Sequence, residues 1–329
     1  MSTTMTSLKP NGEADQVRII LWTFPRTLST ALIKCLSQID GVEIWFEPYC
    51  FCSMAAREYR RAHGRELPTS YAGNETKFTE AARLLSKVAL MPAGVIDPER
   101  LAYEGVKERL ESSTSKYVIV KDMALSMSDK KYRRYLPDGF THAYLIREPA
   151  AAITSYRRAT YQSFLSAGYL VGEARDENKF DIERDNFLMD AGLFHQELCE
   201  LWRYSSQHSK ASALPKEGSS ERSKQSVIIE SDDLLTKPHE VLPKFCRALG
   251  LPYDQSLLRW DASADVAFTW KAAGDEVLRH NVHFYKTAMS STHFVPANKR
   301  TQVQNVFEDV RRLAEKARPY YEEMYNHKL

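Results

Sequence analysis

The chain has 329 residues, of which 43% are hydrophobic and 27% are charged. These proportions are typical of globular proteins, and they exclude the collagen-like, low-complexity and intrinsically disordered classes. The 45 lysines and arginines against 43 aspartates and glutamates leave a net charge of +2, with His neutral. That balance lacks the basic excess of most nucleic-acid-binding proteins. We therefore expect no nucleic-acid partner, and we expect any bound anion to be held by a local site.

Neither a membrane nor a metal is indicated as a partner. No apolar run approaches the roughly 18 residues that a membrane span needs, and residues 1–16 are polar, without the apolar core of a signal peptide. We expect these residues to form a flexible leader and the protein to be cytoplasmic. The five cysteines are odd in number and lack CxxC spacing, which favours reduced thiols and no metal site.

The first elements are two short strands with a helix between them. Residues 18–22 form an apolar run typical of a buried strand, and residues 28–39 carry apolar side chains at helical spacing. Residues 42–46 are the second predicted strand. Because Pro48 disfavours helical geometry at the residue before it, we expect Glu47 to be extended at the end of this strand.

Three more strands are predicted, at residues 117–120, 143–146 and 226–230. Helices are predicted from about residue 150, over 187–204, over 241–249, and from 302 to about 318, where Pro319 should end or kink the last one. Residues 205–226 are rich in serine and are expected to form a solvated loop.

Strands that alternate with helices predict an α/β fold, in which a mainly parallel sheet is flanked by helices on both faces. The strand pattern resumes directly after the serine-rich segment, so we interpret 205–226 as a loop inserted into one domain over residues 17–329.

Charged residues stand at the carboxyl ends of the first four predicted strands. They are Arg26, Glu47, Lys121 with Asp122, and Arg147. Ligands of open α/β sheets bind at these ends. Three cations and two carboxylates at one edge indicate an anionic ligand together with proton transfer.

The loop after the first strand is predicted to hold an anion. Its sequence, Pro25-Arg26-Thr27-Leu28-Ser29-Thr30, combines hydroxyls and an arginine with the start of a helix, where backbone amides attract negative charge. The loop lacks the glycines and the Lys-Ser/Thr pair of a Walker A motif. Taken alone, it is better explained by simple capping of a helix by Ser29 and Thr30, with Arg26 as a surface charge.

A second motif indicates what the loop at 25–30 binds. Arg147 ends the fourth strand and Ser155 follows eight residues later. This pair, together with the loop at 25–30, resembles the sulfotransferases that use 3′-phosphoadenosine 5′-phosphosulfate (PAPS). Residues 229–234 and 248–251 resemble a further segment of that family. The resemblance implies a nucleotide-kinase-like three-layer fold.

The resemblance also implies which residues bind the donor. Residues 25–30 would hold the 5′-phosphosulfate, and Arg147 with Ser155 would hold the 3′-phosphate. Lys299 and Arg300 lie where the tail of the family often adds a basic phosphate contact. Leu28 stands where the family usually has glycine.

The catalytic pattern resembles the membrane-anchored branch of the family. Glu47-Pro48 is similar to its glutamate after the second strand, and Lys121-Asp122 is similar to its lysine after the third. The resemblance implies that Glu47 is the general base, provided that burial raises its pKa from about 4.3. Lys121 and Arg26 would stabilise the leaving phosphate. Asp122 either orients its neighbours or is itself the base.

These observations predict a PAPS-dependent sulfotransferase that acts on a hydroxyl of a small molecule, releases adenosine 3′,5′-bisphosphate (PAP) and requires no metal. The alternatives are a P-loop-type kinase or hydrolase, and a non-catalytic nucleotide-binding relative. His283 or His293 are candidates for the lining of the acceptor pocket. Arg157 and Arg158 are expected on an exposed basic face of their helix.

Overall fold

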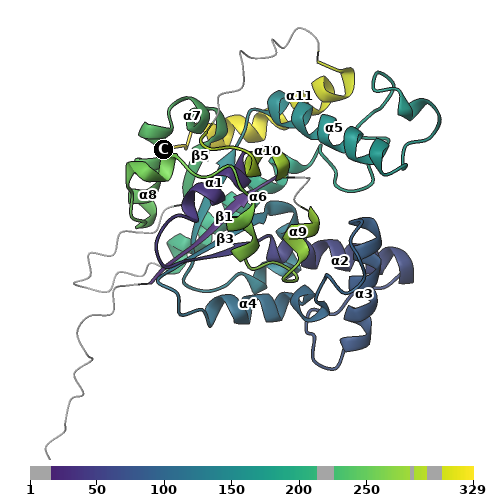
Figure 1. Ribbon diagram of the computed structural model, residues 1–329, viewed down its shortest axis with the longest axis horizontal. Helices are drawn as coiled ribbons and strands as arrows, with labels where there is room; N and C mark the ends of the chain where they lie inside the picture. Colours follow the sequence, from purple (N-terminus) through teal and green to yellow (C-terminus); the bar gives the residue numbers. More distant parts are fainter. Residues whose placement is uncertain (1–15, 213–225, 282–284, 295–305) are drawn as a thin grey trace, which may run out of the picture.

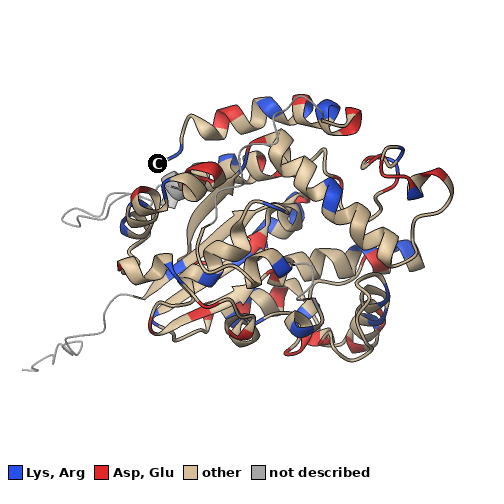
Figure 2. Cartoon of the chain, turned by 45° about the horizontal axis from the view of Figure 1, so that its top comes forward, with Lys and Arg blue, Asp and Glu red and all other residues tan. Residues whose placement is uncertain are grey.

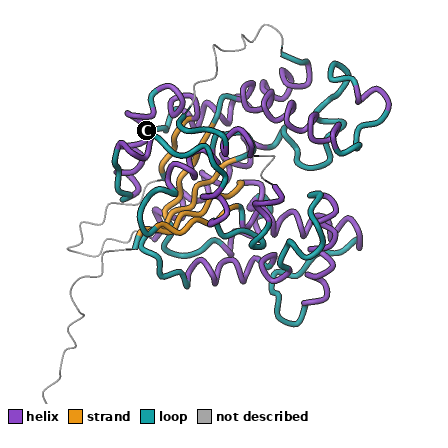
Figure 3. Tube along the Cα trace, viewed as in Figure 1, coloured by secondary structure: helices purple, strands orange, loops and turns teal. Residues whose placement is uncertain are grey.

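The computed structural model describes residues 16–212, 226–281, 285–294 and 306–329. Its centre is a five-stranded sheet with the order β2-β3-β1-β4-β5. The strands are β1 (Val17–Thr23), β2 (Val42–Phe46), β3 (Tyr117–Met123), β4 (Thr141–Ile146) and β5 (Val227–Glu230). All four neighbouring pairs are parallel, so the predicted α/β class with a parallel sheet is confirmed (Figures 1 and 3).

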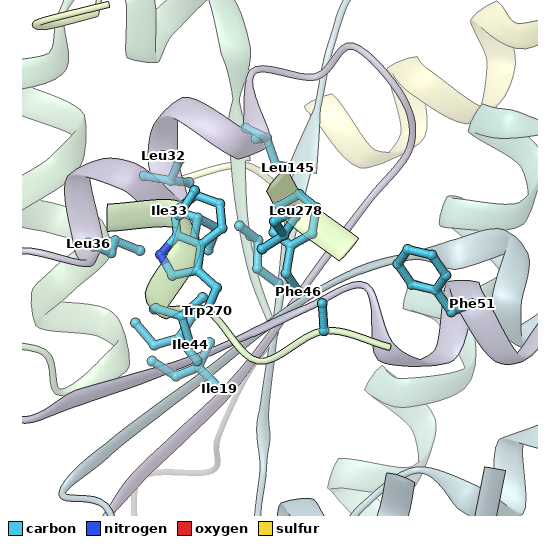
Figure 4. Packing of buried hydrophobic residues seen from close by; sticks show 14 of the residues in the cluster. Ile19, Leu32, Ile33, Leu36, Ile44, Phe46, Phe51, Leu145, Trp270 and Leu278 are labelled. Carbon is cyan, nitrogen blue, oxygen red and sulfur yellow. The ribbon is translucent and has the colours of Figure 1, made fainter. Parts of the chain in front are cut away.

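Helices cover both faces of the sheet. Within β1, Ile19 and Leu21 belong to one buried apolar cluster, whereas Ile20 and Trp22 belong to another. This alternation follows from the two-residue period of a strand. Figure 4 shows part of the first cluster, in which Ile19, Ile33 and Trp270 come from three separate segments. Two cores on one sheet confirm the three-layer arrangement.

The helices are distributed over the whole described chain. They are α1 (Ser29–Leu36), α2 (Pro48–His63), α3 (Glu75–Val88), α4 (Tyr103–Glu111), α5 (Pro149–Ser166), α6 (Phe194–Ser212), α7 (Ser231–Thr236), α8 (Pro238–Leu249), α9 (Val277–Asn281), α10 (Lys286–Met289) and α11 (Glu308–Tyr325). Charged residues of both signs are interspersed along them (Figure 2). No helix in the described part of the chain is long and apolar enough to span a membrane.

The boundaries of helix α6 and strand β3 differ from the predicted ones. Helix α6 begins at Phe194 instead of 187, because Asn186 and Asp190 accept backbone N–H bonds in turns ahead of it. It also continues to Ser212, into the segment predicted as a serine-rich loop from 205. Strand β3 runs on through Lys121 and Asp122, which pair in register with β1.

The last helix is also longer than predicted. Helix α11 continues through Pro319 to Tyr325. Its apolar stripe extends beyond the proline as far as the buried Met324, and burial of that stripe outweighs the backbone hydrogen bond that proline cannot make. The predicted start of this helix at 302 lies outside the described residues. So do residues 1–15 of the predicted leader and residues 213–225 of the predicted loop.

Both outer strands have a backbone neighbour outside the sheet. Phe46 N donates to Lys271 O at 2.8 Å, and Lys271 N donates to Ile44 O at 2.9 Å. On the opposite side, Leu329 N donates to Ile228 O of β5 at 2.9 Å. The first of these contacts fixes the end of β2, directly before Glu47.

Candidate functional site

A cavity of about 720 Å³ opens at the carboxyl ends of the strands. The structure brings together most of the residues predicted to act on a ligand. Pro25, Arg26, Leu28, Ser29, Thr30, Glu47, Lys121, Arg147 and Ser155 all line this cavity. Thr27 and Asp122 lie beside it without lining it. Lys299 and Arg300 lie outside the described residues.

The loop before α1 has an unusual backbone. Arg26 and Leu28 both have φ of 71°, in the left-handed region, which costs about 1–2 kcal/mol for a residue with a side chain. Leu28 thus adopts the glycine-like conformation itself. It is the N-cap residue of α1 and makes no side-chain cap. The first amides of α1 are therefore not used by that side chain, and Ser29 and Thr30 at this helix end line the cavity.

Thr27 stabilises the conformation of the loop before α1. It is fully buried, and its Oγ1 donates to Phe24 O at 3.1 Å. The Ser231 hydroxyl lies 2.7 Å from Thr27 O and 2.8 Å from Ile146 O, so it ties the loop to the end of β4. Thr27 therefore holds the shape of the loop while its neighbours line the cavity.

Two arginines meet at the loop. Arg147 Nη1 donates to Arg26 O at 2.5 Å, and Arg26 Nε donates to Ser155 Oγ at 3.1 Å. Burial lowers the pKa of Arg26, and the positive charge of Arg147 lowers it further. Among the described residues, buried Arg147 Nε has no hydrogen-bond partner. Bound anionic groups at the two guanidinium groups would relieve their repulsion, and one at Arg147 would satisfy this donor.

The backbone at Glu47 differs from the prediction. Glu47 is not extended; its φ of 57° and ψ of 37° are left-handed, and it is the N-cap residue of α2. Its N–H donates to Lys121 O at 2.7 Å, which continues the sheet contact by one residue. Helix α2 then begins at once with Pro48, whose fixed φ suits the first helical position. The sharp turn directs the Glu47 side chain into the cavity.

Glu47 forms a buried ion pair with Lys121. Lys121 Nζ donates to Glu47 Oε1, and the side chains are 2% and 5% exposed. Lys121 Nζ also lies 4.7 Å from the centroid of the Phe46 ring. The pair places a carboxylate and an ammonium group side by side at the wall of the cavity, where one can accept a proton and the other can stabilise negative charge.

Asp122 points to the opposite face of β3. Its carboxylate accepts the N–H groups of Tyr49 at 2.7 Å, Cys50 at 3.0 Å and Met123 at 2.7 Å. Burial raises the pKa of Asp122 to about 8, although these amide bonds act in the other direction. Asp122 therefore anchors the first turn of α2, the helix that Glu47 begins.

Sequence reasoning missed Tyr285. Its hydroxyl donates to Glu47 Oε2 at 3.4 Å, and its ring packs edge-on against Phe46. Burial and the nearby Glu47 carboxylate raise its pKa well above 10, so it remains a donor. Tyr285 lies 238 residues from Glu47 in the chain, and no motif or spacing connects the two positions.

The segment that carries Tyr285 forms one wall of the cavity and is tied to α1. Buried Lys34 donates to Met289 O at 2.5 Å and to Ser291 O at 3.3 Å. His293, a candidate for the acceptor pocket, lines the cavity; His283 lies outside the described residues.

Arg157 is not on an exposed basic face, contrary to the prediction. It is 2% exposed and pairs with Asp309 at 2.9 Å, with its guanidinium 3.6 Å from the centroid of the Phe307 ring. Arg157 therefore fastens α5 to the start of α11. Arg158 is exposed, as expected.

The fold and the cavity together are those of an α/β protein with a charged site at the ends of its parallel strands. Residues 218–328, about a third of the chain, match the family model described as the sulfotransferase domain. This match includes the predicted family segment at 229–251 and confirms the resemblance to sulfotransferases. It supports sulfuryl transfer as the general class of activity. A search among curated proteins finds no match.

Solved structures similar to this chain are also sulfotransferases. The sulfotransferase domain of the Synechococcus PCC 7002 olefin synthase is 16% identical, with 94% of this chain and 98% of that chain covered and a TM-score of 0.37. A sulfotransferase from Alicyclobacillus acidocaldarius is 13% identical, with 95% of this chain and 96% of that chain covered and a TM-score of 0.43. Mouse sulfotransferase SULT7A1 complexed with PAP is 10% identical, with 96% of this chain and 85% of that chain covered and a TM-score of 0.39.

Proposed function

We propose that this protein transfers the sulfuryl group of PAPS to a hydroxyl of a small molecule. The observation that carries the proposal is the buried Glu47–Lys121 pair, which lines the same cavity as Arg26, Arg147 and Ser155. Sulfuryl transfer needs a proton acceptor for the attacking hydroxyl and positive charge for the leaving phosphate. The cavity contains both within one wall.

The donor would be held by its two phosphate-containing ends. The start of α1, with Arg26, Ser29 and Thr30, suits the 5′-phosphosulfate, because amides, hydroxyls and a guanidinium converge there. Arg147 and Ser155 suit the 3′-phosphate, and Arg147 Nε supplies a donor that is buried without a partner among the described residues. The group that PAPS supplies is the sulfuryl group itself.

In the transfer, the acceptor oxygen bonds to sulfur while the bond between sulfur and the phosphate oxygen breaks. Glu47 takes the hydroxyl proton, and Lys121 and Arg26 stabilise the charge that passes to the released PAP. Protonation of Glu47 removes its negative charge from beside Lys121. The full positive charge of Lys121 then acts on the leaving oxygen at the moment when that charge develops.

The test is transfer of labelled sulfate from PAPS by the variant Glu47→Gln. We expect kcat to fall about 10²–10⁴-fold, the usual contribution of a general base, with PAP binding retained. Glu43→Gln is a matched control, since Glu43 lies in β2, four residues before Glu47, bonds Trp45 and Lys271, and does not line the cavity. Full transfer by Glu47→Gln would remove Glu47 from the mechanism.

A binding experiment separates the proposal from a kinase or hydrolase. We expect PAP to raise the melting temperature in a concentration-dependent way and ATP to do so far less. Stabilisation by ATP alone would favour the P-loop-type alternative. Stabilisation by PAP without any transfer would favour a non-catalytic relative.

A further inference from the structure

The cavity is much larger than the cluster of charged groups at its donor end. The charged side chains Arg26, Glu47, Lys121 and Arg147 come from the loop before α1 and from the strand ends. Beyond them the lining becomes uncharged. Among the described lining residues there is no further Asp, Glu, Lys or Arg, and His293 contributes the one imidazole.

Two helices carry the uncharged lining away from the reacting groups. On α2, Phe51 and Met54 follow Glu47 by one and two turns. On α5, Ala159 and Ser163 follow Ser155 in the same way. At 1.5 Å per residue these stretches extend about 10–12 Å from the charged end. Val88 at the end of α3 and Leu188 add further apolar surface.

Two methionines form the far boundary. Met54 and Met189 line the large cavity and also a second one of about 150 Å³, whose other walls include Arg57, Asp190 and Glu197. The backbone around Met189 is held, since Asn186 Nδ2 donates to Met189 O at 2.5 Å and Arg57 donates to Leu188 O. The flexible thioether side chains therefore separate an apolar chamber from a polar one.

We infer that the acceptor is an uncharged alcohol with an apolar body about 10 Å long, whose length is limited by Met54 and Met189. This inference rests on the proposed function. The hydroxyl lies at Glu47, and the body lies between α2 and α5. A sugar or a charged chain is disfavoured, because its polar groups would lose their hydration against Phe51, Met54 and Val88. The hydroxyls of Thr160 and Ser163 on α5 can pair with only some of the hydroxyls of a sugar, and no described side chain on this wall carries a charge opposite to that of a carboxylate.

The test compares acceptors that differ in one property. 1-Octanol and 8-hydroxyoctanoate have the same length, and only the second carries a charge; glucose is small and polar. With PAPS as donor, we expect kcat/KM for 1-octanol to exceed that for either other acceptor at least tenfold. Equal or faster transfer to glucose or 8-hydroxyoctanoate would overturn the acceptor class and leave sulfuryl transfer standing.

A binding measurement without turnover separates the inference about the acceptor from the proposed sulfuryl transfer. Calorimetric titration of 1-octanol into the PAP-bound protein measures occupancy of the apolar chamber directly. Saturable binding with no sulfation of any acceptor would support the apolar chamber and contradict the proposed function. Absence of 1-octanol binding would overturn the inference whatever the transfer assay shows.

A variant of Met189 tests whether the two methionines limit the length of the acceptor. Met189→Ala joins the two cavities, so we expect the ratio of kcat/KM for 1-decanol over 1-octanol to rise at least threefold while PAP binding is unchanged. Val171→Ala is the control, since Val171 is 76% exposed and does not line either cavity. An unchanged ratio in Met189→Ala would contradict the role of Met189 as a limit on acceptor length.

Discussion

Backbone strain is concentrated at this site. In the described residues, four non-glycine residues have positive φ: Arg26, Leu28, Glu47 and Leu90. The first three line the large cavity, and Leu90 directly follows Val88 and Ala89, which also line it. Such conformations persist where the surrounding structure enforces them, and they cluster at functional sites. Their position here supports the site independently of any charge.

Tyr285 is a positioning residue for the base. Lys121 holds one oxygen of Glu47 and the Tyr285 hydroxyl holds the other. We expect Tyr285→Phe to lower kcat about tenfold or less, the effect of losing one hydrogen bond to a carboxylate. The melting temperature and the KM for PAPS should stay nearly constant, because the ring remains packed on Phe46. Steady-state kinetics and a thermal melt check this, and a change in KM alone would contradict it.

The strand-end rule explains which site residues the sequence could predict. Arg26, Glu47, Lys121 and Arg147 follow or end strands, and the ends of parallel strands meet at one edge. Tyr285 comes from an irregular segment whose position depends on buried Lys34 and its contacts with backbone carbonyls. Tertiary contacts of this kind leave no pattern in the chain.

At the scale of elements, the side chains of β3 alternate between the two faces of the sheet. Lys121 and Asp122, which are adjacent in the sequence motif, therefore lie on opposite faces. Lys121 faces the cavity, and Asp122 faces the start of α2. In Asp122→Asn, an amide NH₂ would replace an oxygen that accepts a backbone N–H. We expect the free energy of unfolding to fall by about 1–3 kcal/mol, as measured by urea denaturation.

Activity should respond differently in the two carboxylate variants. Asp122→Asn should lose activity only as far as the turn at Glu47 is disturbed. Glu47→Gln should lose activity even in the protein that remains folded, and it should also lower stability, because it leaves the buried Lys121 ammonium group without its carboxylate partner. Complete loss of transfer in a stable Asp122→Asn protein would assign the base to Asp122 instead.

The same local interactions explain the errors in predicted elements. The proline rule correctly excludes an ordinary helical residue at Glu47, but the two amide bonds from Tyr49 and Cys50 to Asp122 start α2 so early that Glu47 must turn sharply. At Pro319 the proline rule predicts the end of a helix, but α11 continues because the packing of Met324 stabilises its last turns. In both places long-range burial decides against a local preference.

At the scale of the whole molecule, stability in acid depends on a buried histidine. Burial against Phe24 lowers the pKa of His195 to about 4, and its Nε2 lies 3.0 Å from Arg147 O. Between pH 6.5 and 4 the unfolded chain binds a proton that the folded chain excludes. Stability should therefore fall as the pH decreases through this range, by up to about 1.4 kcal/mol per pH unit for one histidine.

His195→Gln tests this effect. The glutamine keeps an N–H donor but does not titrate, so we expect unfolding free energy to depend less on pH between 6.5 and 4 than in the wild type. Glu197 and Glu230, whose pKa values burial raises to about 7, act with the opposite sign, and the comparison of variant with wild type cancels them. Exposed His208 provides the control His208→Gln; parallel curves for all three proteins would contradict the assignment.

The short backbone contacts at the two sides of the sheet have a consequence for self-association. A strand at the margin of a sheet with unsatisfied amides and carbonyls is a template for a strand from another molecule. Here Lys271 occupies that position beside β2, and Leu329 occupies it beside β5. Lys271 and Leu329, which take no part in the chemistry, thus occupy backbone groups of the outer strands and hinder the pairing of a strand from another molecule at those positions.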